Sequence, residues 1–266
     1  MRLFAIGDLH LPSSRGKDME RFGWTGHPKP LAAAWDEAVT SDDLVLVVGD
    51  ISWDTKAHEA VQDLAWIELR PGKKVLLRGN HDYWWGDSAN KLRQLLAPTP
   101  SIVGFLHNGS ALAVGPYLIA GSRLWTTAQA PPLPGGEMGD VLPSTDYVQR
   151  EATRLTRSLA QAQSLLGQQP ALTKVVATHF PPLYAGGVPT AFSPLIEEFA
   201  PLVCVYGHLH GPGIAAGFVG PHGGVRYVLA SADAAGFRPL QLLPLHEDEG
   251  TGVVGKELAP LTSPRP

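Results

Sequence analysis

Short apolar runs along the chain end abruptly in polar turns that contain glycine. The first run starts at residue 3 and gives way to Gly7 and Asp8. Continuous apolar runs of this length, bounded by turns and rich in β-branched residues, are typical of strands buried on both faces. We therefore predict buried strands at residues 3–6, 44–48, 75–77, 175–177 and 203–206.

Between most of these runs the apolar positions recur with helical spacing. In the longest such segment, Leu155, Leu159 and Leu166 line one face. Strands that alternate with helices indicate an α/β protein. We predict helices at residues 30–39, 58–69, 88–96, 146–166 and 194–199.

The middle of the chain lacks this alternation. Residues 101–125 contain short apolar runs separated by Gly, Asn and Pro, which predicts strands joined by tight turns. Residues 225–230 and 240–243 show the same pattern near the end. Two mixed β-sheets packed face to face and flanked by helices would accommodate both sets of strands. The predicted fold is therefore a four-layer α/β/β/α arrangement.

Proline and glycine mark the expected loops. Residues 126–144 form the longest expected surface loop, and loops of that length often carry function. We expect a single domain over residues 1–245 and a loosely packed C-terminal tail over residues 246–266.

Composition narrows the class of protein. The formal net charge is −4 and no Lys/Arg cluster stands out, so the sequence carries no strong nucleic-acid signature. The single cysteine, Cys204, excludes an internal disulfide or a Cys-rich zinc site. The chain has no apolar run long enough to span a membrane, and its first apolar stretch is too short for a signal peptide. We therefore expect a cytoplasmic protein without a membrane partner.

Side chains that bind metals follow every one of the predicted buried strands. Sites in open α/β sheets form at the carboxyl ends of the strands. Asp8 and His10 are two residues apart, so in an extended chain they point the same way, and His208 and His210 repeat this spacing. The candidate residues at this edge are Asp8, His10, Asp50, Asn80, His81, His179, His208 and His210.

The chemistry of this set favours a catalytic metal centre. It offers oxygen and nitrogen ligands without a thiolate, which suits Mn²⁺ best, with Fe or Zn²⁺ as alternatives. The set is too large for one catalytic ion. Two ions require a shared ligand, and a carboxylate such as Asp50 can bridge them. Centres with two metal ions serve phosphoryl transfer.

Five sequence blocks in this order resemble the calcineurin-like metallophosphoesterases. Each block alone has an ordinary explanation as a turn or a half-buried histidine, but together they are specific, because each ends a predicted strand. The blocks are Asp8-Leu9-His10, Gly49-Asp50, Gly79-Asn80-His81-Asp82, His179 and Gly207-His208-Leu209-His210.

The resemblance implies a four-layer metallophosphoesterase sandwich and a hydrolytic mechanism with two metal ions. It implies that a hydroxide between the ions attacks phosphorus and that His81, which binds no metal, protonates the leaving oxygen. The implied ligands are Asp8, His10 and His210 for the first ion, Asn80, His179 and His208 for the second, and Asp50 as the bridge.

The second block departs from the pattern of the protein Ser/Thr phosphatases. That branch carries Gly-Asp-x-x-Asp-Arg-Gly, whereas here the second acidic residue, Asp54, comes one position later and the arginine is missing. The chain is more similar to the large group of uncharacterised bacterial phosphohydrolases. The departure leaves Asp54 and Asp82 as alternative partners for His81.

Several further residues could line the substrate site. His27 lies in a Gly- and Trp-containing loop after the first block, where surface or packing roles are the alternative. Arg123 lies at an expected strand end and could contact phosphate. Trp84 and Trp85 follow the third block, and their position is equally compatible with a pocket wall and with the core.

The expected function is hydrolysis of a small phosphorylated substrate or nucleotide, as a phosphodiesterase or a phosphatase. A nuclease is disfavoured by the net charge of −4. A non-catalytic metal-binding scaffold of the same fold is the alternative from another class. That alternative is disfavoured because His81 and the ligand set are complete. The sequence indicates neither the substrate nor an oligomeric state.

Overall fold

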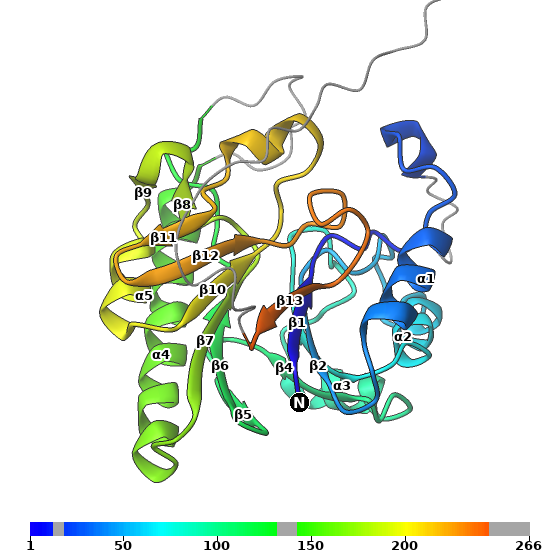
Figure 1. Cartoon of the computed structure of the whole chain (residues 1–266), viewed down its shortest axis with the longest axis horizontal. Helices are drawn as coiled ribbons and strands as arrows, with labels where there is room; N and C mark the ends of the chain where they lie inside the picture. Colours follow the sequence, from blue (N-terminus) through cyan, green and yellow to red (C-terminus); the bar gives the residue numbers. More distant parts are fainter. Residues whose placement is uncertain (13–18, 132–142, 245–266) are drawn as a thin grey trace, which may run out of the picture.

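Two β-sheets packed face to face form the centre of the molecule, and helices cover their outer faces (Figure 1). The computed structural model describes residues 1–12, 19–131 and 143–244. Within these ranges the predicted fold class, two mixed sheets flanked by helices, is confirmed.

The first sheet contains the three N-terminal buried strands predicted from the sequence. Its order is β13-β1-β2-β3-β4, and its pairs are parallel except for the antiparallel pair between β13 and β1. The strands are β1 (Leu3–Ile6), β2 (Leu44–Val48), β3 (Lys73–Leu77), β4 (Ile102–Leu106) and β13 (Leu240–Leu243).

The second sheet has the order β11-β12-β10-β7-β6-β5. Its four central strands are parallel, and an antiparallel strand closes each edge. The strands are β5 (Leu112–Val114), β6 (Tyr117–Ser122), β7 (Thr173–Thr178), β10 (Val203–Tyr206), β11 (Gly220–His222) and β12 (Val225–Leu229).

Helices cover the outer face of each sheet. Apolar side chains of α1, α2 and α3 pack with Phe4 and Ile6 of β1, whereas α4 and α5 pack against the second sheet. The five α-helices in the described ranges were predicted to within a few residues. They are α1 (Lys29–Ala38), α2 (Val61–Glu68), α3 (Ala89–Leu96), α4 (Thr145–Gln168) and α5 (Ser193–Phe199).

Several short strands and 3₁₀ turns were not predicted from the sequence. They are too short to show a hydrophobic period, which explains why the sequence does not reveal them. They comprise the hairpin of β8 (Leu183–Tyr184) and β9 (Val188–Pro189) and the 3₁₀ turns η1 (Met19–Phe22), η2 (Ala185–Gly187) and η3 (Gly211–Ala216).

The alternation of side chains along β1 explains its continuous apolar run. Leu3 and Ala5 face the second sheet, whereas Phe4 and Ile6 face the helices. Both faces of the strand are therefore covered, as parallel sheets require. The layer between the sheets draws on both of them and includes Val48 and Val175.

The carboxyl ends of the parallel strands of both sheets meet at one rim. The backbone N–H of Gly7, after β1, donates to the carbonyl of Ala230, after β12, at 2.6 Å. The backbone N–H of His208, after β10, donates to the Asp8 carboxylate at 2.9 Å. Residues from both sheets therefore share this rim.

Two expectations fall partly or wholly outside the described residues. Of the expected loop 126–144, residues 132–142 lie outside them, and the part before them includes the buried Thr126 and Thr127. The expected tail 246–266 lies entirely outside them, and the single domain over 1–245 stays a prediction. None of the helices in the described ranges combines the length and the apolar character that crossing a bilayer requires.

A buried carboxylate ties the first two strands together at their amino ends. Asp43 accepts hydrogen bonds from the Arg2 backbone at 2.9 Å and from the Arg2 Nη2 at 2.5 Å. It also accepts from the backbone N–H and the hydroxyl of Thr40. Burial alone would raise the pKa of Asp43, but Arg2 and Thr40 hold it well below its usual value.

We expect Asp43→Ala to lower the free energy of unfolding by about 2–3 kcal/mol, because buried and charged donors lose their acceptor. Since the folded-state pKa is depressed, the contribution of Asp43 is complete above pH about 4 and is lost as the pH falls further. Urea unfolding at several pH values measures this. The difference in unfolding free energy between Asp43→Ala and wild type should narrow as the pH falls from about 4 to about 2, and the exposed Asp42→Ala is the control. A gap that does not change with pH would contradict the assignment.

Candidate metal centre

The loops after β1 and β2 hold three of the predicted ligands in an uncommon backbone conformation. The φ angles of Asp8, His10 and Asp50 are 54°, 45° and 49°, in the left-handed region. Each loop fixes the other, because the N–H groups of Asp8 and His10 donate to the carbonyls of Gly49 and Asp50, both at 2.9 Å. Such conformations persist only where the surroundings over-determine them, and they cluster at functional sites.

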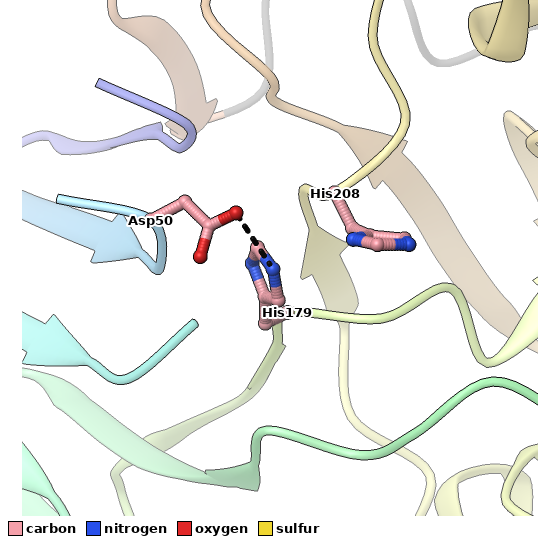
Figure 2. A group of neighbouring side chains, drawn as sticks. All are labelled: Asp50, His179 and His208. Atoms are coloured by element: carbon pink, nitrogen blue, oxygen red, sulfur yellow. Dashed lines mark ion pairs between the residues drawn. The ribbon is translucent and has the colours of Figure 1, made fainter. Parts of the chain in front are cut away.

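Asp50 lies between histidines from the two sheets. Its Oδ2 is 3.5 Å from the Nε2 of His179, which follows β7, and 3.9 Å from the Nε2 of His10, which follows β1. Its Oδ1 accepts a hydrogen bond from the backbone N–H of His81 at 2.8 Å. Figure 2 shows the carboxylate of Asp50 beside the ring of His179, with His208 on the far side of that ring.

The structure brings the predicted ligands together in two groups that share Asp50. In each group the ligand atoms lie within 4.8 Å of one another. The groups are Asp8, His10 and Asp50, and Asp50, His179 and His208.

Two further predicted ligands adjoin these groups. The Oδ1 of Asn80 is 2.8 Å from the Nε2 of His179, beside the second group. The ring centroid of His210 lies 5.6 Å from that of His10, beside the first.

Hydrogen bonds orient the ligands of the second group. The Nδ1 of His179 lies 3.0 Å from the carbonyl of Val48, so this nitrogen donates and Nε2 faces Asp50. Ligating histidines are commonly oriented in this way by the other ring nitrogen. His208 adopts a φ of 70°, and its backbone N–H is held by Asp8.

Two glycines are required by the close approach of the loops. Gly49 has a φ of 100°, and a side chain there would collide with the ring of His179. A side chain at Gly79 would collide with the carboxylate of Asp50. The glycines that precede Asp50 and Asn80 in the sequence blocks therefore make room for the ligands.

Burial and mutual attraction set the charges of the acidic ligands and of His179. Burial raises the pKa of Asp8 to about 6, while His179 lowers it and Asp50 raises it further. Burial would also raise the pKa of Asp50, but His179, followed by His81, holds it well below its usual value. Although burial opposes it, Asp50 raises the pKa of His179 to about 9.

The residues fit a divalent metal ion. His10 is 1% exposed, and neither of its ring nitrogens has a hydrogen-bond partner among the described residues. Burial lowers the pKa of His10 and of His208 well below the usual value, so both rings are neutral ligands. A buried polar atom without a partner is costly, and a coordinated cation removes that cost. The mixed oxygen and nitrogen donors suit Mn²⁺, Fe or Zn²⁺.

The two alternative partners of His81 have different surroundings. Asp82 accepts hydrogen bonds from the backbone N–H groups of Gly79, Ile51 and Ser52 and from the indole of Trp84, at 2.7–3.2 Å. It therefore joins the loops after β2 and β3. Asp54 is buried, and its backbone N–H donates to the Ser52 hydroxyl at 3.0 Å.

His81 itself is half-buried beside the ligand groups. Its ring centroid lies 4.7 Å from that of Trp53 and 5.8 Å from that of His10. Trp53 also stacks on His10, with centroids 4.6 Å apart and an interplanar angle of 21°. Trp53 therefore forms one wall beside His81.

The remaining predicted residues are not members of the two ligand groups. His27 packs against Trp24, whose ring also contacts His10 and His210. Trp84 and Trp85 are buried in the core beneath α1–α3 and are not pocket walls.

Arg123 leads to a residue that the sequence analysis missed. Its guanidinium packs over Trp125 and lies 3.5 Å from the buried carboxylate of Glu151 on α4. Glu151 shares a helix face with the buried Leu155, Ser158 and Leu159. A charged residue on the apolar face of the longest predicted helix was the available signal.

Comparisons with known proteins agree with this geometry. A family model described as calcineurin-like phosphoesterase matches residues 1–212. The gene 66 proteins of Mycobacterium phages L5 and D29 are 39% and 42% identical to this chain over 77 and 78 residues. These segments are 28% of this chain, and the chain spans only 37% of the length of each phage protein.

A solved structure shares the fold over nearly the whole chain. The phosphopantetheinyl hydrolase of Mycobacterium tuberculosis superposes with a TM-score of 0.54 at 20% identity. The superposition covers 94% of this chain and 98% of the other.

We expect Asp82→Ala to weaken both the fold and the centre. The buried donors that Asp82 satisfies would lose their acceptor, which lowers the free energy of unfolding by about 3 kcal/mol. The loops that present Asp50 and Asn80 would no longer be joined, so Mn²⁺ affinity should fall about 10- to 100-fold. Calorimetric titration measures the affinity. The control is Asp87→Ala in the same loop, where the side chain is 90% exposed. Equal Mn²⁺ affinity in Asp82→Ala and wild type would contradict this role.

Proposed function

The chain belongs to the calcineurin-like phosphoesterase family, and we propose that it hydrolyses small phosphoesters with two divalent metal ions. The observation that supports two ions is that two ligand groups share Asp50. Apart from Asp50, the residues of one group follow the first sheet's β1, and those of the other follow strands of the second sheet. A single carboxylate placed between two sets of imidazoles is suited to bridge two cations.

The ligands divide naturally between two ions, with Mn²⁺ preferred and Fe or Zn²⁺ as alternatives. When bound, such ions lower the pKa of a coordinated water and neutralise charge on the phosphate. In this proposal Asp50 serves both ions. The other ligands are Asp8, His10 and His210 for the first ion and Asn80, His179 and His208 for the second.

His81 is the proposed proton donor to the leaving oxygen. Its backbone N–H is bonded to the Asp50 carboxylate, so its position is fixed relative to the ligands. Its half-buried ring lies beside Trp53, and the ring of the exposed Tyr83 lies 6.3 Å away. Imidazole is the side chain used most often for general acid–base catalysis.

A small phosphorylated compound or nucleotide is the proposed substrate class. The net charge of −4 and the lack of a run of basic residues in the sequence disfavour a nucleic-acid polymer. The name of the M. tuberculosis structural neighbour makes phosphopantetheinyl esters one candidate to test. An interaction scaffold would not need His81 beside a complete ligand set, so a hydrolase is favoured.

The first experiment compares hydrolysis of bis-p-nitrophenyl phosphate and p-nitrophenyl phosphate by the metal-stripped protein, with and without Mn²⁺. We expect turnover only with Mn²⁺, and the preferred ester distinguishes a phosphodiesterase from a phosphatase.

Asp50→Asn removes the bridging charge, so the bound metal should fall from two ions to at most one, counted by elemental analysis. Two ions in Asp50→Asn would contradict the bridge, and no turnover of either ester by a protein with two ions would favour the scaffold.

His81→Ala tests the proton donor separately from metal binding. We expect turnover to fall about 10²- to 10⁴-fold while the metal content stays that of wild type. The exposed His58→Ala is the control. If His81→Ala retained wild-type turnover, His81 would have no part in the reaction.

A further inference from the structure

A charged cavity adjoins the metal centre on the same rim. It is lined by the last residues of β3, β4 and β6 and by α4, which packs along β6 (Figure 1). Three guanidinium groups, of Arg78, Arg123 and Arg154, converge on it together with the carboxylate of Glu151. Its volume of about 30 Å³ suits one small polar group and excludes a nucleobase.

The carboxylate of Glu151 is already fully engaged. The Glu151 side chain is 1% exposed, its Oε2 accepts from the Ser122 hydroxyl at 2.7 Å, and its Oε1 accepts from Arg154 Nη1 at 2.6 Å. The same Oε1 lies 3.5 Å from Arg123 Nη2. This single negative charge therefore faces more than one guanidinium.

Positive charge remains in excess around the cavity. The Nε atoms of Arg78 and Arg123 are buried and have no hydrogen-bond partner among the described residues. The only ion pair seen for Arg78 within the described ranges is with Asp87 at 3.8 Å, and that side chain is 90% exposed, so solvent screens it. Burial lowers the pKa of Arg123, Glu151 opposes this, and the nearby Arg78 and Arg154 lower it further.

The backbone connects the cavity directly to the second ligand group. The carbonyl of Arg123 accepts the N–H of His179 at 3.2 Å and of Phe180 at 2.9 Å. Arg78 precedes Asn80 by two residues, so their Cα atoms are at most about 7 Å apart. The cavity therefore adjoins the two loops that carry Asn80 and His179.

We infer that this cavity binds a second anionic group of the substrate, a phosphate or a carboxylate, while the scissile phosphoester lies at the metal centre. The inference rests on the proposed function and deepens it. Guanidinium groups bind such oxyanions through paired, charge-assisted hydrogen bonds. An oxyanion would supply the partners that the buried Nε atoms lack and would balance the excess charge. The preferred substrates are therefore those with two separate anionic groups.

The test compares two chromogenic esters that differ only in a second phosphate. They are thymidine 5′-(p-nitrophenyl phosphate) and the same ester carrying a 3′-phosphate. With the Mn²⁺-loaded wild type, we expect KM to be about tenfold lower for the 3′-phosphorylated ester. Arg154→Gln should bring the two KM values within about twofold, because the amide cannot replace the guanidinium. The exposed Arg157→Gln on the same helix should keep the wild-type ratio.

Two further measurements separate the possible outcomes. Arg154→Lys keeps the positive charge and should recover part of the lower KM for the 3′-phosphorylated ester. Such recovery would show that Arg154→Gln acts through loss of charge and not through misfolding. Inorganic phosphate is also titrated into the metal-free protein, where wild type should bind about tenfold more tightly than Arg154→Gln.

Each result decides a different claim. Hydrolysis of both esters with equal KM by wild type would overturn the inference and leave the proposed function intact. Failure to hydrolyse either diester, together with tighter phosphate binding by wild type than by Arg154→Gln, would overturn the role of the cavity in substrate binding but leave an anion site. The proposed function is decided separately by the two p-nitrophenyl esters. Equal phosphate affinity of the two proteins would overturn the anion site itself.

Discussion

The attraction between one buried carboxylate and imidazoles from two sheets governs the arrangement of the rim. Burial alone would neutralise Asp50, yet His179, followed by His81, keeps its pKa well below the usual value. To place the carboxylate between the histidines of the two sheets, the chain adopts left-handed backbone at Asp8, His10 and Asp50. Glycines at 49 and 79 clear the space. The left-handed backbone of these loops and their two glycines therefore both serve the placement of one carboxylate.

Much of the fold was accessible from the sequence because it rests on simple periodicities. Parallel strands covered on both faces must be apolar throughout, which made β1, β2 and β10 visible as continuous runs. The long amphipathic pattern of α4 was equally clear. Because the carboxyl ends of parallel strands meet at one edge, the order of the polar blocks also predicted which side chains would gather, and the structure places them there.

Side-chain direction beyond the strand ends was not accessible. Tight turns have no period, so nothing in the sequence distinguished Trp84 and Trp85 as core residues from pocket walls. The direction of the Asp82 side chain was equally inaccessible from the sequence. Asp82 is next to His81 in sequence, but its carboxylate accepts hydrogen bonds from backbone N–H groups of two loops. Glu151 stood out as a charged residue on an apolar helix face, but its contact with Ser122 was not accessible, because that residue lies on a strand distant in sequence.

Neither sheet contains the whole centre, since Asp8, His10 and Asp50 follow strands of one sheet and His179 and His208 follow strands of the other. The separation of the two ligand groups is consequently set by the thickness and register of the apolar layer between the sheets, where Val48 and Val175 lie. Close-packed interiors transmit small changes in volume instead of absorbing them. A methyl group gained or lost in the layer between the sheets would therefore change the distance between the two ligand groups at the rim.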